Sequence, residues 1–283
     1  MIPDKVRHWL QEQGHGAVTG EQSVGGGCIN NGARLQTEGG ATFFLKTNAH
    51  APADMFAREA EGLAELRGDH GPRLPDALLW NQEFILLEDL APAPRVHDYS
   101  EILGRQLAAL HKRTKDLFGF EQDNYLGSTP QPNKWTKDGH EFFAEQRLNY
   151  QARLARDKDE LTRAEAAQVE RLAARLPELV PAQPASLTHG DLWGGNAIAD
   201  NRGQPALIDP AAHYGWAEAE LGMTALFGGF DSAFYRAYEE SRPLDKGWRN
   251  RLPIYNLYQL LNHLNLFGAG YHAQVIEVLR RFA

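Results

Sequence analysis

Two short segments in the second half of the chain constrain its fold and chemistry more than any other feature. They are His189-Gly190-Asp191-Leu192-Trp193-Gly194-Gly195-Asn196 and Leu207-Ile208-Asp209-Pro210. Asn196 stands five positions after Asp191, and Asp209 stands thirteen positions after Asn196. Metal-assisted phosphoryl transfer needs a carboxylate that accepts a hydroxyl proton, and an amide oxygen and second carboxylate that hold Mg²⁺. The spacing predicts Asp191 as the proton acceptor, with Asn196 and Asp209 as metal ligands.

Each segment alone also fits an ordinary turn. Gly190 can supply a positive φ and Asp191 can cap a helix, whereas Asp209 followed by proline can simply end a strand. The combination is more specific, because two glycines lie between Trp193 and Asn196 and an apolar run precedes Asp209. A phosphotransferase needs further parts, and the first half of the chain supplies candidates for them.

A glycine-rich segment lies between two candidate strands, one ending near Val24 and the other starting near Gly32. It consists of Gly25, Gly26, Gly27, Cys28, Ile29 and Asn30. The backbone N–H groups of such a hairpin can approach phosphate oxygens without obstruction by a Cβ atom. Taken alone, the segment is equally typical of a plain flexible hairpin.

The next strand, residues 42–46, is apolar and ends on Lys46. A lysine at the end of a buried strand is costly unless it is paired, so it calls for a carboxylate and a phosphate. Residues 55–66 carry apolar side chains at helical spacing, and Glu59 can face the sheet from that helix. Glu61 is the competing partner and is expected on the solvated face.

Residues 84–90 are typical of a central strand, and the Pro-rich segment 91–94 after them indicates a hinge. We expect backbone groups of Glu88, Asp89 and Leu90 to bind an adenine edge, although a linker without ligand contact fits the same pattern. The hinge divides the chain into lobes at 1–90 and 91–283. Amphipathic stretches near 98–113, 138–157, 162–176, 217–240 and 246–281 predict a mainly helical second lobe.

Several stretches together carry a family resemblance. They are residues 26–30, 55–59, 129–133 and 189–196, Leu226-Phe227-Gly228-Gly229-Phe230, and Leu261-Asn262-His263-Leu264-Asn265-Leu266-Phe267-Gly268. With the order of glycine loop, strand lysine, helix glutamate, hinge and His-Gly-Asp loop, the chain resembles the fructosamine-3-kinase family of ketosamine kinases. This family lies within the aminoglycoside phosphotransferase branch of the protein-kinase-like fold.

The resemblance implies an α+β, bilobal fold with a small antiparallel-sheet lobe that carries one main helix. It implies an ATP- and Mg²⁺-dependent enzyme that phosphorylates the 3-hydroxyl of ketosamines, free or protein-bound, in protein deglycation. On matching positions, Lys46 and Glu59 orient the phosphates, and Trp193 and His263 line the sugar pocket. Two other function classes stay open: a kinase of another amine-containing alcohol, and a nucleotide-binding regulator without catalysis.

One departure from the family pattern concerns the acceptor site. Where the family reads Tyr-Gly-His-Arg-Glu-x-Asp-Leu, this chain has Trp216 and Ala217 in place of the basic pair. An exposed Trp216 near the acceptor would enlarge the apolar wall of the acceptor site. Alternatively, the basic pair makes only a local salt bridge in relatives, which contributes little when exposed.

Composition narrows the partners and the location. The net charge of −8 argues against nucleic acid, which requires a basic surface, and it is compatible with a cationic amine substrate. The chain start lacks the apolar core of a signal peptide, and no run reaches the length of a membrane span, so a cytoplasmic location is expected. Scattered histidines without paired spacing do not favour a zinc site.

The single cysteine, Cys28, excludes an intramolecular disulfide. Its place in the glycine loop, where backbone N–H groups gather, favours a thiolate. The resemblance implies redox control through an intermolecular disulfide between two such loops, and so either a monomer or a redox-linked homodimer. A small buried side chain without redox function fits Cys28 equally well.

Overall fold

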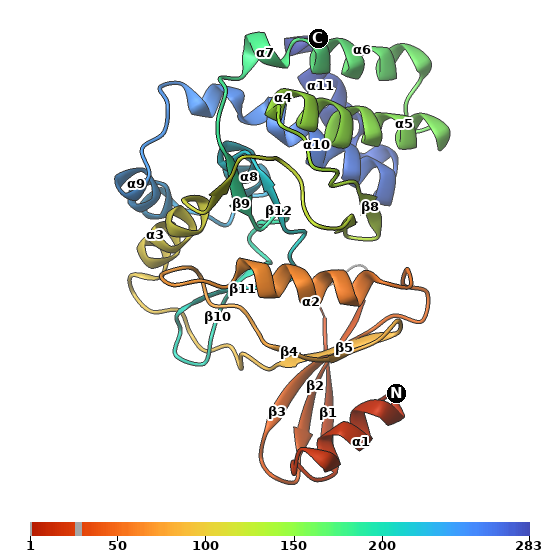
Figure 1. Ribbon diagram of the computed structural model, residues 1–283, viewed down its shortest axis with the longest axis vertical. Coiled ribbons are helices and arrows are strands. Elements are labelled where there is room, and N and C mark those ends of the chain that lie inside the picture. The colour runs from red at the N-terminus through yellow and green to blue at the C-terminus, as the bar shows by residue number, and fades with distance from the viewer. Residues whose placement is uncertain (1, 26–29) are drawn as a thin grey trace.

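The structure is a computed structural model that describes residues 2–25 and 30–283. Two lobes stack along its long axis, with the first part of the chain forming the smaller one (Figure 1). The smaller lobe holds an antiparallel sheet and the larger one is mainly helical. This arrangement confirms the predicted α+β, bilobal fold.

The smaller lobe is built on five antiparallel strands in the order β1-β2-β3-β5-β4. The strands are β1 (Val18–Val24), β2 (Asn31–Thr37), β3 (Thr42–Thr47), β4 (Ala77–Trp80) and β5 (Phe84–Glu88). Helix α1 (Asp4–Glu12) covers one face of the sheet, and α2 (Met55–Leu66) lies between the other face and the larger lobe (Figure 1).

Strand alternation explains why Lys46 faces the inside of the molecule. On β3, Phe43 and Leu45 belong to the small core beneath α1. Because successive side chains of a strand point to opposite faces, Phe44 and Lys46 face α2 and the larger lobe. Four apolar residues of α2 (Met55, Phe56, Leu63 and Leu66) belong to the main core that runs through the larger lobe.

In its described residues, the larger lobe contains nine α-helices, together with short helical turns and small sheets. Its helices are α3 (Tyr99–His111), α4 (Gly139–Phe143), α5 (Tyr150–Asp157), α6 (Arg163–Ala174), α7 (Leu176–Leu179), α8 (Ala217–Leu226), α9 (Ser232–Ser241), α10 (Trp248–Phe267) and α11 (His272–Phe282). A π-helical turn, η1 (Ala144–Asn149), joins α4 to α5, and a 3₁₀ turn, η2 (Ala269–Tyr271), precedes α11.

Seven short strands complete the larger lobe and carry the site loops. They are β6 (Thr114–Lys115), β7 (Asn124–Leu126), β8 (Thr129–Gln131), β9 (Ala185–Thr188), β10 (Ala197–Ala199), β11 (Pro205–Leu207) and β12 (His213–Gly215). The loop 189–196 joins β9 to β10, and Asp209 follows β11. Since β10 pairs with β11, the ends of these two loops are held side by side.

Glycines divide two of the predicted helical stretches. The stretch near 217–240 breaks after α8 at Gly228 and Gly229, whose φ values are +73° and +98°. The stretch near 246–281 breaks at Gly268, with a φ of +79°. Positive φ is incompatible with a right-handed helix and costs glycine little, so the chain turns at these positions.

The predicted division at residues 90 and 91 falls in the irregular segment between β5 and α3. We keep it as a proposal for the lobe boundary. Within the described residues, every helix is too short or too polar to cross a membrane.

Candidate active site

A cleft of about 810 Å³ separates the two lobes and gathers most of the predicted site residues. Those lining it are Gly25, Asn30, Lys46, Glu59, Glu88, Asp89, Leu90, Asp191, Trp193, Asn196, Asp209 and His263. Gly25 and His263, which are 238 positions apart in the chain, thus share one cavity. Gly26, Gly27, Cys28 and Ile29 lie outside the described residues.

The lysine of β3 links the two lobes electrostatically. Lys46 Nζ lies 2.6 Å from Glu59 Oε1 of α2 and also bonds to Asp209 Oδ1, and only 5% of Lys46 is exposed. Burial alone lowers the pKa of Lys46, but the charges of Asp209 and Glu59 outweigh it and raise the pKa above the ordinary value. Lys46 is therefore a permanent cation. Glu61 lies instead on the exposed side of α2, 2.8 Å from Arg58 Nη1.

Hydrogen bonds fix Asp191 and Asn196 within the catalytic loop and link this loop to the segment that carries Asp209. Asn196 donates its amide N–H groups to the backbone oxygen of Asp191 at 2.8 Å and to Asp191 Oδ2 at 3.1 Å. His189 Nε2 lies 2.9 Å from the carbonyl of Ile208, and its Nδ1 lies 3.3 Å from the backbone N–H of Asp191. Burial lowers the pKa of His189, so a neutral ring donates to one loop and accepts from the other.

Asp191 has a higher proton affinity than an ordinary aspartate. Burial raises the pKa of Asp191 to about 8, and the negative charge of Asp209 adds to this effect. Phosphoryl transfer does not need a raised pKa here, because in a loose transition state the proton leaves late. A cation held at Asn196 and Asp209 would stabilise the carboxylate and lower this value.

The buried carboxylate of Glu220, which the sequence analysis did not single out, hydrogen-bonds to the backbone of the loop 189–196. Glu220 of α8 accepts the backbone N–H of His189 at 3.0 Å and that of Gly190 at 2.7 Å. Its Oε2 also lies 2.8 Å from Nε2 of His111, whose Nδ1 is 2.7 Å from the Tyr238 hydroxyl. Although burial opposes it, these hydrogen bonds and the nearby histidines hold the pKa of Glu220 below its usual range. Its contacts with Gly190, His189 and His111 are 30, 31 and 109 positions away in the chain, so no local pattern signals them.

The hinge offers fewer free backbone groups than predicted. The backbone N–H of Glu88 already donates to Asp76 at 2.8 Å, which corrects the expectation that it is free. The Asp89 carboxylate is covered and lies 2.7 Å from Nε of Arg34. The backbone N–H of Leu90 has no hydrogen-bond partner among the described residues, so it can bind an adenine edge.

Trp216 does not lie in the cleft, and the expectation of an exposed indole there is wrong. The side chain is 3% exposed and packs among Phe118, Phe143 and Tyr255 in the core of the larger lobe. Burial of a large apolar ring is favoured over exposure, and the position before α8 directs it inward. Trp216 therefore contributes to packing rather than to the cleft wall.

Several cleft residues were not singled out from the sequence. Leu87, Ile198 and Ile208 line the cleft, as do Phe227, Phe267 and Tyr271, whose rings lie around His263. Phe227 and Phe267 fall in stretches that carried the resemblance, but their spacing alone gave them no site role. Tyr271 had no sequence signal, because a turn residue shows no periodicity.

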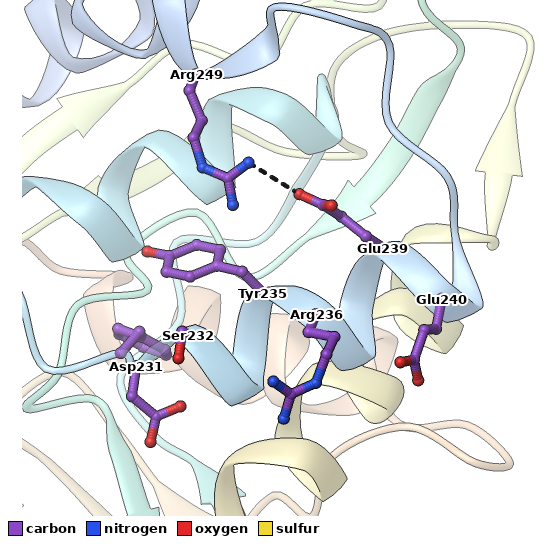
Figure 2. A pocket seen from close by; sticks show the side chains of 8 residues that line it. Asp231, Ser232, Tyr235, Arg236, Glu239, Glu240 and Arg249 are labelled. Carbon is purple, nitrogen blue, oxygen red and sulfur yellow. Dashed lines mark hydrogen bonds and ion pairs between the residues drawn. The ribbon is translucent and has the colours of Figure 1, made fainter.

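A second hollow lies on α9, away from the predicted site residues (Figure 2). Figure 2 shows Arg249 reaching toward Glu239, at 3.1 Å, with Tyr235 beside them. Asp231 in the same hollow accepts a hydrogen bond of 2.7 Å from Ser100. Arg249, Glu239 and Asp231 thus already have partners, and the hollow contains none of the residues predicted to take part in phosphoryl transfer.

Comparisons with known proteins show which family the chain is similar to. The model of the fructosamine kinase family matches residues 1–283. A probable ketoamine kinase from Synechocystis sp. is 40% identical over 265 residues, which cover 92% of this chain and 89% of that protein. A chloroplastic protein-ribulosamine 3-kinase from Arabidopsis thaliana is 39% identical over 289 residues, covering 99% and 87%.

Solved structures give the same assignment. A crystal structure assigned as a fructosamine-3-kinase from Thermobifida fusca has a TM-score of 0.88 and 34% identity, and the match covers 99% of this chain and 98% of that one. An aminoglycoside phosphotransferase solved with ADP and hygromycin B has a TM-score of 0.62 at 15% identity over 99% of both chains, which shows a shared fold alone. The chain belongs to the fructosamine kinase family and is an ATP-dependent phosphotransferase.

Proposed function

We propose that this protein transfers the γ-phosphoryl group of ATP to the 3-hydroxyl of a ketosamine, a fructosamine or ribulosamine, free or protein-bound. The observation that carries the proposal is the meeting of Lys46, Asp191, Asn196 and Asp209 in one cleft between the lobes. The relatives named as a ketoamine kinase and a ribulosamine 3-kinase support the acceptor class. Protein deglycation follows as the proposed role.

The donor set in the cleft suits Mg²⁺. The amide N–H groups of Asn196 are used by Asp191, which leaves Asn196 Oδ1 as a free ligand beside the Asp209 carboxylate. Oxygen ligands from one or two side chains, completed by phosphate oxygens and water, are what Mg²⁺ prefers. Among the described residues no cluster of three His, Cys, Asp or Glu side chains forms a closed metal site. When bound, the metal neutralises phosphate charge.

The chain's own residues divide the remaining work. Lys46, held by Glu59, binds phosphate oxygens, and the Leu90 N–H binds the adenine edge. Asp191 accepts a hydrogen bond from the acceptor hydroxyl, aligns it with the phosphorus atom and takes its proton late in the transfer. Trp193 and His263 line the sugar side of the cleft.

An acceptor panel tests the proposal. Wild-type protein with Mg²⁺ and ATP is offered an N-alkyl fructosamine, an N-alkyl ribulosamine, choline and an aminoglycoside, and NMR locates the phosphate on each product. We expect phosphate on O3 of the ketosamines. Turnover of choline or the aminoglycoside alone would indicate a kinase of another amine-containing alcohol, and no turnover of any acceptor would indicate a regulatory nucleotide-binding protein.

Replacing the proton acceptor separates catalysis from binding. In Asp191→Asn, we expect turnover to fall by roughly 10²–10⁴-fold, the range for a positioned general base. Nucleotide affinity, measured by calorimetry with a non-hydrolysable ATP analogue, should change little because Lys46 and the hinge are intact. Equal losses in turnover and nucleotide affinity would place Asp191 in nucleotide binding instead.

Redox control through Cys28, a cytoplasmic location and a monomer or redox-linked homodimer remain proposals. Non-reducing electrophoresis after peroxide treatment tests the first, with Cys28→Ser as the control. A disulfide-linked dimer in wild type alone supports it. A chain that stays monomeric excludes the disulfide switch.

A further inference from the structure

Three aromatic rings surround His263 on the acceptor side of the cleft. The ring centroid of His263 lies 4.8 Å from Phe227, 5.5 Å from Phe267 and 5.0 Å from Tyr271. Phe227 is 41% exposed and Phe267 is 48% exposed, and both line the cleft. We call these four residues the aromatic cluster. A group of exposed large apolar rings inside a cleft marks a binding surface rather than packing.

The aromatic cluster has a fixed position relative to the catalytic loop. A Cβ added to Gly194 would lie 3.3 Å from the carbonyl oxygen of Gly228 and 3.4 Å from Cα of Gly229. The loop after Phe227 therefore packs directly on the loop that carries Asp191. A ligand that contacts the cluster can present a neighbouring atom to the Asp191 carboxylate.

Among the described lining residues, basic side chains are confined to one half of the cleft. Arg34, Lys46 and Arg58 all come from the smaller lobe, which also contributes the carboxylates of Glu59, Glu88 and Asp89. The described lining of the larger lobe includes the carboxylates of Asp191 and Asp209 but no lysine or arginine. The acceptor side, which belongs to the larger lobe, therefore disfavours an anion.

The imidazole of His263 adds a hydrogen-bond acceptor at the centre of the cluster. Its Nδ1 lies 2.8 Å from the carbonyl oxygen of Gln259. A carbonyl can only accept, so Nδ1 carries the hydrogen and, in the neutral ring, Nε2 is an acceptor. Burial lowers the pKa of His263, which favours the neutral ring. Nε2 has no hydrogen-bond partner among the described residues.

We propose that the aromatic cluster binds the protonated amine of the acceptor and the first carbons attached to it, while the sugar hydroxyl is presented to Asp191. This inference rests on the proposed function and specifies how the ketosamine is recognised. The rings of Phe227, Phe267 and Tyr271 attract the ammonium through their π faces, and Nε2 of His263 accepts one of its N–H groups.

Other occupants fit the cluster less well. An anionic substituent would need a lysine or arginine, which the described lining of this half lacks. A neutral alkyl ether would contact the rings but leave Nε2 of His263 without a donor, which is unfavourable once water is excluded. The cluster is therefore expected to distinguish a ketosamine from an uncharged sugar of the same shape.

Two matched acceptors test the inference. They are 1-deoxy-1-(propylamino)fructose, which is cationic at neutral pH, and 1-O-propylfructose, in which a neutral ether oxygen replaces the amine. For wild type, we expect kcat/KM to favour the amine by about tenfold or more, the size of a desolvated cation–π contact. Phe227→Leu and Phe267→Leu should each lower this preference several-fold. The loss of kcat/KM should be larger for the amine, through KM, and smaller for the ether, which contacts the rings without a charge.

Trp80→Leu is the matched control, since Trp80 is an exposed aromatic residue (45%) on β4 that does not line the cleft. It should leave the preference unchanged, and thermal unfolding checks that all variants are folded. Equal losses for both acceptors in the leucine variants, or equal use of both acceptors by wild type, would overturn the inference while leaving the proposed function standing. Turnover of neither acceptor by wild type would overturn both.

Discussion

Two glycines of the catalytic loop are required for different physical reasons. Gly190 has a φ of +86°, and a Cβ there would lie 2.1 Å from the carbonyl oxygen of Ala211. A Cβ at Gly195 would lie 2.3 Å from the indole of Trp193. The first glycine allows two backbone segments to approach, and the second lets the Trp193 ring lie flat against the loop. Of the two glycines, only Gly195 therefore controls a side chain that lines the cleft, the indole of Trp193.

Gly195→Ala should displace the Trp193 indole and impair acceptor use. We expect kcat/KM for the ketosamine to fall about tenfold or more, because small misplacements at a reacting centre are costly. KM for ATP should change less, since Lys46 and the hinge lie on the other side of the cleft. Steady-state kinetics with each substrate varied in turn measures both.

Gly270→Ala is the control for this substitution, because a Cβ at Gly270 would meet no atom within 4 Å. It should leave both kinetic constants near the wild-type values. If Gly195→Ala also behaved like wild type, the Trp193 indole would not contribute to acceptor binding.

Among the elements, α2 is fixed to the larger lobe along its length. Arg113 donates from its guanidinium to the carbonyls of Glu65, Leu66 and Arg67, at 2.7, 3.1 and 2.8 Å. At the other end of α2, the Tyr125 hydroxyl donates to Asp54 at 2.6 Å. Since α2 carries Glu59, these bonds set the position of the Lys46–Glu59 pair from the larger lobe.

Arg113→Met should loosen the C-terminal end of α2. The three carbonyls lose a charged donor, so we expect the free energy of unfolding to fall by about 1–2 kcal/mol, reduced by the partial exposure of Arg113. KM for ATP should rise several-fold because Glu59 is less firmly placed. Denaturant unfolding and ATP kinetics measure the two effects.

Arg175→Met serves as the comparison, since Arg175 is similarly exposed and bonds to Glu178 and to the carbonyl of Phe282, far from α2. It should leave KM for ATP unchanged. An unchanged KM in Arg113→Met as well would mean that α2 is held by packing alone.

Local patterns predicted those elements whose structure depends on neighbouring residues. The apolar strand that ends on Lys46 indicated a buried lysine that needs a carboxylate, and helical spacing placed Glu59 on the side of α2 that meets it. Contacts between distant residues were not predictable in this way. Glu220 resembled any helical carboxylate until its bonds to His189 and Gly190 were seen, and the burial of Trp216 depends on rings from three other segments.

For the whole molecule, buried neutral histidines set a limit on acid stability. His111 and His189 are both fully buried, and burial lowers the pKa of each, although Glu220 acts against this effect. In the unfolded chain a histidine takes up a proton below about pH 6.5. The unfolded state then binds more protons than the folded state, so the free energy of unfolding falls as the pH is lowered.

Each of these histidines should therefore lower the stability below about pH 6.5 by up to about 1.4 kcal/mol per pH unit, until the folded state also takes up the proton. Asp191, whose pKa burial raises to about 8, keeps a proton in the folded state and acts in the opposite direction, so the test compares the slope of each variant with that of wild type. His111→Gln should reduce this slope, because the amide can still donate to Glu220 but does not titrate. His8→Gln, at a surface position whose side chain is 74% exposed, should leave the slope unchanged. Urea unfolding at pH 7.5, 6.5 and 5.5 measures the slopes, and parallel slopes for all three proteins would contradict the prediction.

The most direct measurement is a crystal structure of the protein with Mg²⁺ and a non-hydrolysable ATP analogue. The account predicts adenine against the Leu90 N–H, phosphate oxygens on Lys46, and Mg²⁺ bound by Asn196 and Asp209, with the Asp191 carboxylate facing the γ-phosphate. A nucleotide bound elsewhere, or bound in the cleft with its metal away from Asn196 and Asp209, would contradict it.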